Sequence, residues 1–137
     1  MRIALYQPDI PQNLGAMMRL CACLDIPLDI IEPCGFVWNE RKIGIAALDY
    51  REHVKLQRHD SWESFCETFA DKRIVLMTTK ASVPYPQFEF TRNDILLAGR
   101  ESAGVPDHVH EKADGRVLIP MENGQRSLNI VNATAMI

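Results

Sequence analysis

Apolar residues along this chain gather into short continuous runs, which are separated by stretches of mixed pattern. The runs cover residues 3–6, 28–31, 54–56, 74–77, 95–98 and 117–119. The runs at 74–77 and 95–98 contain no polar residue, which is typical of strands covered on both faces of a sheet. We therefore predict six short strands, of which these two are buried.

Helical patterns occupy the stretches between the runs. The first begins at Asn13, a residue type that caps helices well. Its apolar positions recur at helical spacing and form one face: Leu14, Met17, Met18, Cys21 and Leu24. Further helices are expected at 38–50, after a cap at Asp60 or Ser61, at 106–112, and from Ser127 to the last residue. Strands that alternate with helices predict an α/β fold, with a mostly parallel sheet and helices on both faces, in one domain over residues 1–137.

Composition and charge narrow the class of protein. The net charge of −3 and the pI of about 5.8 argue against a surface coated in positive charge for nucleic acid, although a local basic patch is compatible with them. No apolar run approaches the roughly 20 residues of a membrane span. The first residues lead directly into a strand without a secretory signal.

Cysteines and histidines give no sign of a metal centre. We interpret the four cysteines, which lack C-x-x-C spacing, as small buried residues of a cytoplasmic protein: Cys21, Cys23, Cys34 and Cys66. His108 and His110 are two positions apart and would point to different faces of a helix. We therefore expect no metal site.

Three loops follow strands and precede helices, which is where open α/β sheets bind ligands. The first loop leads to Gly15 and Arg19, which lie four apart on one helical face. Arg19 is expected to lean back over Gly15 toward the mouth of the sheet, where a guanidinium can bind a phosphate or ribose oxygen. The spacing alone fits a surface arginine beside an ordinary helix at least as well.

The second and third loops are also candidates for a binding site. Gly99-x-Glu101-x-x-Gly104 resembles a nucleotide loop, but the pattern alone is equally that of a structural turn in which Glu101 holds the loop. The third is the polar stretch 119–129. There Ser127 is expected to cap a helix that is apolar nearly all round and therefore buried. Asn129 and Asn132 would then need partners, and they would tie neighbouring loops together.

Together the three loops resemble the three motifs of the SPOUT RNA 2′-O-ribose methyltransferases. These motifs are Asn13-x-Gly15-x-x-x-Arg19, Gly99-x-Glu101-x-x-Gly104-Val105-Pro106, and Ile119-Pro120-Met121 with Arg126-Ser127-Leu128-Asn129. Other stretches resemble the small single-domain tRNA (cytidine(34)-2′-O)-methyltransferases of that superfamily: Leu5-Tyr6-x-Pro8-x-Ile10-Pro11, Ile30-Ile31-Glu32-Pro33-x-Gly35-Phe36, Leu48-Asp49-Tyr50, Arg58-His59 and Thr78-Thr79-Lys80. The resemblance covers almost the whole chain, and it depends on the order and spacing of the motifs.

The resemblance implies a fold, a cofactor and an assembly. The carboxyl-terminal part would be a deep trefoil knot, the SPOUT fold, which general rules of topology would not predict. The cofactor would be S-adenosyl-L-methionine, and matching positions put its contacts on six residues: Met77, Thr78, Gly99, Ile119, Met121 and Ser127. The enzyme would be a homodimer in which each partner completes the other's site. The substrate would be the anticodon stem-loop of tRNA, methylated on the ribose 2′-hydroxyl of the wobble nucleotide, position 34.

The resemblance also implies roles for individual side chains. Arg19 would be the main catalytic residue, Asn13 and Asn129 would shape the pocket, and Glu101 would brace the second loop. A basic patch for RNA would include Arg19, Arg41, Lys42, Arg51 and Arg126. Two alternatives stay open, namely ribose methylation of ribosomal RNA and a non-catalytic domain that binds a small adenosine ligand. The last helix is expected to be unfinished at Ile137, because the family typically continues beyond this point.

Overall fold

Six parallel strands form one sheet in the part of the chain that the structure describes. The computed structural model describes residues 1–122 and 125–137, without the side chains of Ala46, Asp49 and Arg51. The strands are β1 (Arg2–Tyr6), β2 (Leu28–Ile31), β3 (Leu56–His59), β4 (Ile74–Met77), β5 (Ile95–Ala98) and β6 (Gly115–Val117). Their order is β3-β2-β1-β5-β4-β6, and every pairing is parallel. The predicted α/β class with a mostly parallel sheet is confirmed.

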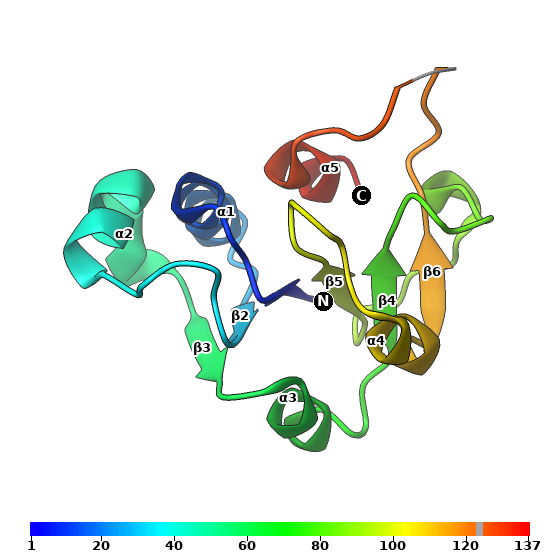
Figure 1. The fold of residues 1–137 in the computed structure, drawn as a ribbon, viewed down its shortest axis with the longest axis horizontal. Helices are drawn as coiled ribbons and strands as arrows, with labels where there is room; N and C mark the ends of the chain where they lie inside the picture. The colour runs from blue at the N-terminus through cyan, green and yellow to red at the C-terminus, as the bar shows by residue number, and fades with distance from the viewer. Residues whose placement is uncertain (123–124) are drawn as a thin grey trace.

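Helices cover both faces of the sheet, as predicted (Figure 1). Ile3 and Leu5 of β1 pack in one core with α1 (Pro11–Cys23) and α2 (Glu40–Ala47). Ala4 and Tyr6 point to the other core, with α3 (Trp62–Thr68) and α4 (Asp107–Lys112). Alternate residues of one strand therefore enter opposite cores. The last helix, α5 (Ile130–Met136), contacts α1 and β5.

Two predicted strands are displaced along the chain. The strand predicted at 54–56 lies further along the chain, since β3 begins at Leu56. Its residues 57 and 58 are exposed at the edge of the sheet. β6 ends at Val117, and residues 118 and 119 leave the sheet. Leu118 instead pairs with the loop after β4, donating its N–H to the carbonyl of Val83 at 3.0 Å. Edge strands need fewer apolar residues, so a search for apolar runs did not detect their polar parts.

Two predicted helix caps are wrong. α1 begins at Pro11, whose fixed φ suits the first helical position, and Asn13 lies inside the helix. At the last helix the cap is Asn129 and not Ser127, since Oδ1 of Asn129 accepts from the N–H of Val131 at 2.9 Å. The polar stretch before it contains residues 123 and 124, which lie outside the described residues.

Other helical predictions are confirmed in part. Ser61 caps α3 and accepts from the N–H of Ser64 at 3.1 Å. The helix predicted at 38–50 is divided into α2 and a 3-10 helix, η1 (Leu48–His53), with a positive φ of 54° at Leu48. A second 3-10 helix, η2 (Tyr85–Gln87), lies in the loop after β4. None of the helices in the described residues is long and apolar enough to span a membrane.

The expectation of uniform burial is wrong for the cysteines and for the last helix. Cys21 is buried, and burial raises the pKa of its thiol to about 12, but Cys23 is exposed. In α5 only Ala133 and Thr134 are buried, while the side chain of Met136 is 47% exposed. This helix therefore leaves part of its apolar surface uncovered within one chain.

A buried carboxylate holds the amino-terminal edge of the sheet. Asp94, just before β5, is 1% exposed and accepts from Nε of Arg73 at 2.8 Å and from the N–H of Thr91 at 2.8 Å. Burial opposes ionisation, but the hydrogen bonds from Arg73 and Thr91 outweigh it and lower the pKa of Asp94 to about 2. The backbone carbonyl of Asp94 also accepts from Arg2, so the residue links β1 to β5.

The first prediction concerns this carboxylate. Asp94→Asn is expected to lower the free energy of unfolding at pH 7 by about 2 kcal/mol, because charge-assisted hydrogen bonds to a buried group are lost. The folded pKa lies below the unfolded value of about 3.9. The contribution is therefore complete above pH 5 and declines as the pH falls from about 4 toward 2. Urea unfolding of the wild type and the variant at several pH values measures this difference in the free energy of unfolding. The exposed Asp71→Asn is the control, and a pH-independent difference would contradict the assignment.

Candidate active site

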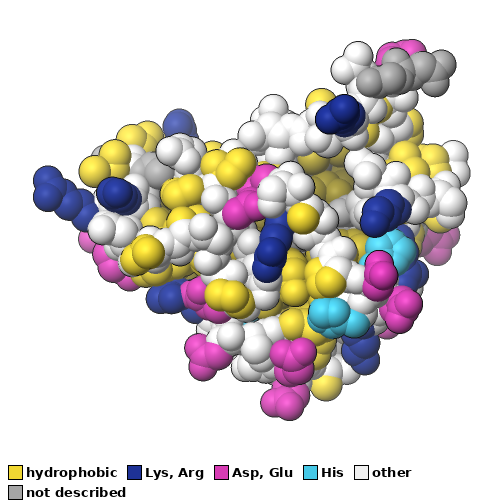
Figure 2. Space-filling view, in the orientation of Figure 1, with side chains coloured by type: hydrophobic (Ala, Val, Ile, Leu, Met, Phe, Trp, Pro, Cys, Tyr) yellow, Lys and Arg dark blue, Asp and Glu magenta, His cyan; other side chains and the backbone are white. Residues whose placement is uncertain are grey.

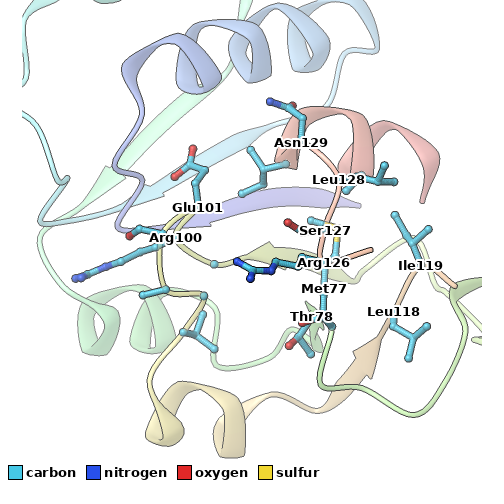
Figure 3. Close-up of a pocket in the computed structure, with 18 of the residues that line it drawn as sticks. Met77, Thr78, Arg100, Glu101, Leu118, Ile119, Arg126, Ser127, Leu128 and Asn129 are labelled. Carbon is cyan, nitrogen blue, oxygen red and sulfur yellow. The ribbon is translucent and has the colours of Figure 1, made fainter. Parts of the chain in front are cut away.

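A cavity of about 550 Å³ opens at the carboxyl ends of β4, β5 and β6 (Figure 3). The three loops singled out in the sequence all contribute to its wall, as their positions at strand ends predict. The lining residues are Ile10, Asn13, residues 76–79, residues 99–105, Leu118, Ile119, Met121, residues 126–130 and Ala133.

The wall on the side of β4 and β6 is largely backbone and apolar side chains. Met77 ends β4, and the N–H of Thr78 donates to the carbonyl of Val117 at 2.9 Å, which holds the two strand ends together. Ile119 follows β6 and is half-buried at the cavity, as is Met121. Four of the six predicted cofactor contacts therefore lie together on this side. Carbonyl and N–H groups at strand ends can read the polar edge of a planar ring while apolar side chains cover its faces.

The second loop turns tightly beside the cavity. Arg100 and Gly104 exchange two backbone hydrogen bonds of 2.9 Å. Gly104 has a positive φ of 67°, which favours glycine, and a Cβ on Gly99 would lie 2.6 Å from the carbonyl carbon of Gly104. Both glycines are thus required by the turn, and the sequence left this structural role open beside the binding role. The turn puts the backbone of Gly99, a predicted cofactor contact, in the cavity wall.

Residues 126–129 of the third loop lie along the cavity in Figure 3. Ser127, the sixth predicted contact, is exposed and lines the cavity with Leu128 and Asn129. The side chain of Arg126 points toward the interior of the cavity in the same view. The sequence placed Arg126 in the third motif and in the RNA patch but gave it no contact in the cavity, although a cation next to Ser127 was a signal for one.

A chain of side-chain hydrogen bonds joins the three loops. Nδ2 of Asn129 donates to Oδ1 of Asn13 at 3.0 Å, and Nδ2 of Asn13 donates to Oε1 of Glu101 at 3.1 Å. The predicted catalytic asparagines therefore lie together, and Asn129 ties loops as expected. Asn132 is exposed, so the expectation that it needs a buried partner is wrong.

Glu101 lies against a second carboxylate, that of Asp9. The N–H of Asp9 donates to Oε2 of Glu101, and the N–H of Glu101 donates to Oδ1 of Asp9, both at 3.2 Å. Burial, together with the neighbouring Asp9, raises the pKa of Glu101. The hydrogen bond with Glu101, assisted by Ser102, lowers the pKa of Asp9. Of the two carboxyl groups, Glu101 therefore holds a proton more readily. The sequence motifs did not include Asp9.

Arg19 lies outside this cavity within one chain. It is exposed on α1, and its guanidinium lies over the ring of Tyr50, 5.2 Å from the centroid. Arg19 therefore does not line the cavity within one chain, and the expectation that it reaches back over Gly15 toward the mouth of the sheet stays a prediction. Its catalytic role stays a prediction that needs a substrate or a second chain at this surface.

Basic side chains do not form one continuous patch on the face shown in Figure 2. Arg41, Lys42 and Arg126 are exposed, and the side chain of Arg51 lies outside the described residues. No cluster of three or more His, Cys, Asp or Glu residues that could hold a metal ion occurs within the described parts of the chain.

Known proteins match this chain over almost its whole length. Residues 1–137 match the model of the SpoU rRNA Methylase family. A tRNA (cytidine(34)-2′-O)-methyltransferase of Beijerinckia indica subsp. indica is 53% identical over 98% of this chain and 86% of its own length.

Solved structures agree with the fold. One, described as "Structural insights into the 2-OH methylation of C/U34 on tRNA", has a TM-score of 0.93 and 37% identity, and covers 98% of this chain and 89% of its own. The SpoU methyltransferase AviRb from Streptomyces viridochromogenes, in complex with the cofactor AdoMet, has a TM-score of 0.88 and 21% identity, over 99% of this chain and 56% of its own. With its three motif loops around one cavity at the carboxyl edge of a parallel sheet, the chain belongs to the SpoU methylase family.

Proposed function

We propose that this protein transfers a methyl group from S-adenosyl-L-methionine to the ribose 2′-hydroxyl of the wobble nucleotide of tRNA, position 34. The observation that carries the proposal is the convergence of Asn13, the 99–105 loop and the 126–130 segment on one cavity. The tRNA methyltransferase that is 53% identical supports the choice of substrate. The proposed place of action is the cytoplasm, where tRNA is available.

The cavity fits the cofactor. Its volume of about 550 Å³ lies within the range of roughly 300–1,000 Å³ that small-molecule sites occupy. The backbone at Met77, Thr78 and Gly99 would hold the adenosine part, with Ile119 and Leu118 against its apolar surface. The tight turn at Gly99 leaves the wall free of side chains at that point. When bound, the cofactor supplies a methyl group on a sulfonium, which is already activated for transfer.

The chain's own residues would orient the acceptor. Asn13 and Asn129 present a fixed pair of amides at the cavity, next to the carboxylate of Glu101. Alignment of a hydroxyl for in-line attack is the larger part of such catalysis, and removal of its proton is the rest. The guanidinium of Arg19 would bind the ribose phosphate and favour the alkoxide.

The proposed assembly is a homodimer in which each cavity receives Arg19 from the partner chain. Two observations support it. Arg19 lies outside the cavity of its own chain. Leu128 and Met136 flank and end the apolar helix α5 and are 43% and 47% exposed, which is surface that a second copy would cover.

The proposed topology is a single domain with a carboxyl-terminal trefoil knot. The loop after β4 pairs with the segment after β6, because Tyr85 donates its N–H to Leu118 at 2.9 Å and Leu118 donates to Val83. The chain then crosses back to α5, which packs on α1 and β5 (Figure 1). This pairing, together with the return of the chain to α5, supports the passage of the last helix through a loop.

The second prediction tests the reaction. Incubation of the protein with S-adenosyl-L-methionine and tRNA lacking the modification is expected to produce 2′-O-methylated cytidine or uridine at position 34. Nucleoside mass spectrometry of the tRNA measures it. Ribosomal RNA is the second candidate substrate because the matching family is described for rRNA, so it is assayed in parallel. Calorimetric binding of the cofactor without transfer to either RNA would instead favour a binding module.

The third prediction concerns Arg19. Arg19→Ala is expected to leave cofactor affinity within about twofold, because the predicted cofactor contacts do not include it, and to lower methyl transfer at least about 100-fold through lost orientation. Calorimetry and transfer of a radiolabelled methyl group separate the two effects. Arg92→Ala, an exposed arginine before β5 at the opposite edge of the sheet, is the matched control. Full transfer by Arg19→Ala would remove the residue from the mechanism.

The fourth prediction tests the shared site. Arg19→Ala and Asn129→Ala are each expected to be inactive. If each site takes Arg19 from one chain and Asn129 from the other, dissociation and remixing in equal amounts restores about a quarter of wild-type activity, because half of the dimers are mixed and each has one intact site. Remixing that restores nothing would mean that both residues act within one chain.

A further inference from the structure

The segment between β1 and α1 carries a side chain that no motif includes, the carboxylate of Asp9. It lies at the end of β1 next to β5, where the strand order reverses from β3-β2-β1 to β5-β4-β6. Ligands of open α/β sheets bind beside such a reversal. In this protein the reversal is occupied by Asp9 and Glu101, which exchange two hydrogen bonds of 3.2 Å between backbone and side chain. Ser102 Oγ donates to the other oxygen of Asp9.

In the chain of hydrogen bonds that runs from Asn129 through Asn13 to Glu101, donors and acceptors can be assigned in only one way. Oδ1 of Asn129 accepts from the helix N–H groups of Val131 and Asn132, so its Nδ2 must face Asn13. Asn13 then presents Oδ1 to Asn129 and Nδ2 to residue 101. An amide nitrogen only donates, so residue 101 must accept, which a carboxylate does at both oxygens. The orientation of both amides thus depends on how firmly Glu101 is held.

We propose that Asp9 is a positioning residue for methyl transfer: its reciprocal hydrogen bonds fix Glu101, and Glu101 in turn fixes the amides of Asn13 and Asn129 at the pocket. The inference rests on the proposed function. Asp9 does not line the cavity, whereas the three residues that it holds do. It therefore acts through them and not on the reactants.

The far side of Asp9 is held by Gly35. The N–H of Gly35 donates to the carbonyl of Pro8 at 2.9 Å, and a Cβ on Gly35 would lie 2.6 Å from Cβ of Asp9 and 3.0 Å from its Cα. The 8–9 segment is thus confined between the loop after β2 and the loop after β5. A methyl group at position 35 would displace Asp9 without touching the cavity.

The surroundings of Glu101 make its ionisation a reporter of this arrangement. The groups that face it are Asp9 from the 7–10 segment and the neutral Asn13 from α1. The adjacent Arg100 has its guanidinium 5.9 Å from the ring centroid of Tyr6. Burial raises the pKa of Glu101, and the side chain of Asp9 raises it further, whereas the hydrogen bond from the N–H of Asp9 lowers it. Loss of the Asp9 charge should therefore lower the pKa of Glu101.

The fifth prediction compares Asp9→Ala with Asp9→Asn. Asp9→Ala is expected to lower the rate of methyl transfer about 10- to 100-fold, as small misplacements of orienting groups do. Its affinity for S-adenosyl-L-methionine, measured by calorimetry, should change less than about twofold, since the cofactor wall at Met77 and Thr78 is not involved. Asp9→Asn keeps an oxygen for the N–H of Glu101 and should recover most of the rate. In Asp9→Asn, carbon-13 NMR should show the pKa of Glu101 lowered.

Two further variants complete the test. Gly35→Ala should reproduce the loss of rate in Asp9→Ala with cofactor affinity unchanged. Ser61→Ala removes the cap of α3, which lies away from the cavity. Its rate of methyl transfer shows how much of a loss destabilisation alone causes. Wild-type transfer by Asp9→Ala would overturn the proposal. Equal losses in Asp9→Ala and Asp9→Asn, with the pKa of Glu101 unchanged, would also overturn it.

Failure of the proposed function is distinguishable from failure of this inference. If the wild-type protein methylates no RNA, the function is wrong, whereas NMR still decides the positioning role. The side-chain amide signals of Asn13 and Asn129 should shift in Asp9→Ala and in Gly35→Ala if Asp9 holds them through Glu101. Signals that stay at their wild-type positions in both variants would sink the inference whatever the activity.

Discussion

Parallel pairing is the constraint on which the site depends. Because every described pairing in the sheet is parallel, each strand delivers its carboxyl end to the same edge. The cavity is built from the segments that leave the strands at this edge: Ile10 after β1, Thr78 after β4, Gly99 after β5 and Leu118 after β6. These positions are spread over more than a hundred residues of chain. One antiparallel strand would carry its loop to the opposite edge and remove a wall of the cavity.

The sequence predicted those parts of the fold whose signal is local. β4 and β5 were predicted at their observed bounds because strands buried on both faces must be apolar throughout. β3 and β6 were misplaced because edge strands tolerate polar residues. In β6 the deciding contact is remote, since Gly115 lies against the ring of Phe88, where a Cβ would be 2.7 Å away. No local pattern records such a contact.

The same division holds at the site. The convergence of three loops could be predicted from strand ends, a local signal. The caps could not, because Ser127 and Asn129 are both good caps, and the choice depends on a hydrogen bond from Asn129 to Asn13, 116 residues away. The role of Asp9 could not be predicted for a similar reason, since its partner Glu101 lies 92 residues further along the chain. Contacts of that range appear in a sequence only through a family resemblance, and here the resemblance did not include Asp9.

The placement of Arg19 away from the cavity has an electrostatic rationale. The polar side of the cavity carries Glu101 with Asp9 behind it. Within one chain, a guanidinium held against these carboxylates would form a bidentate ion pair and lose part of its attraction for a phosphate. Over the ring of Tyr50 the cation is oriented by a cation–π contact. An aromatic ring orients a guanidinium without neutralising it, while the acidic pair, held by backbone N–H groups and Ser102, orders the amides at the cavity.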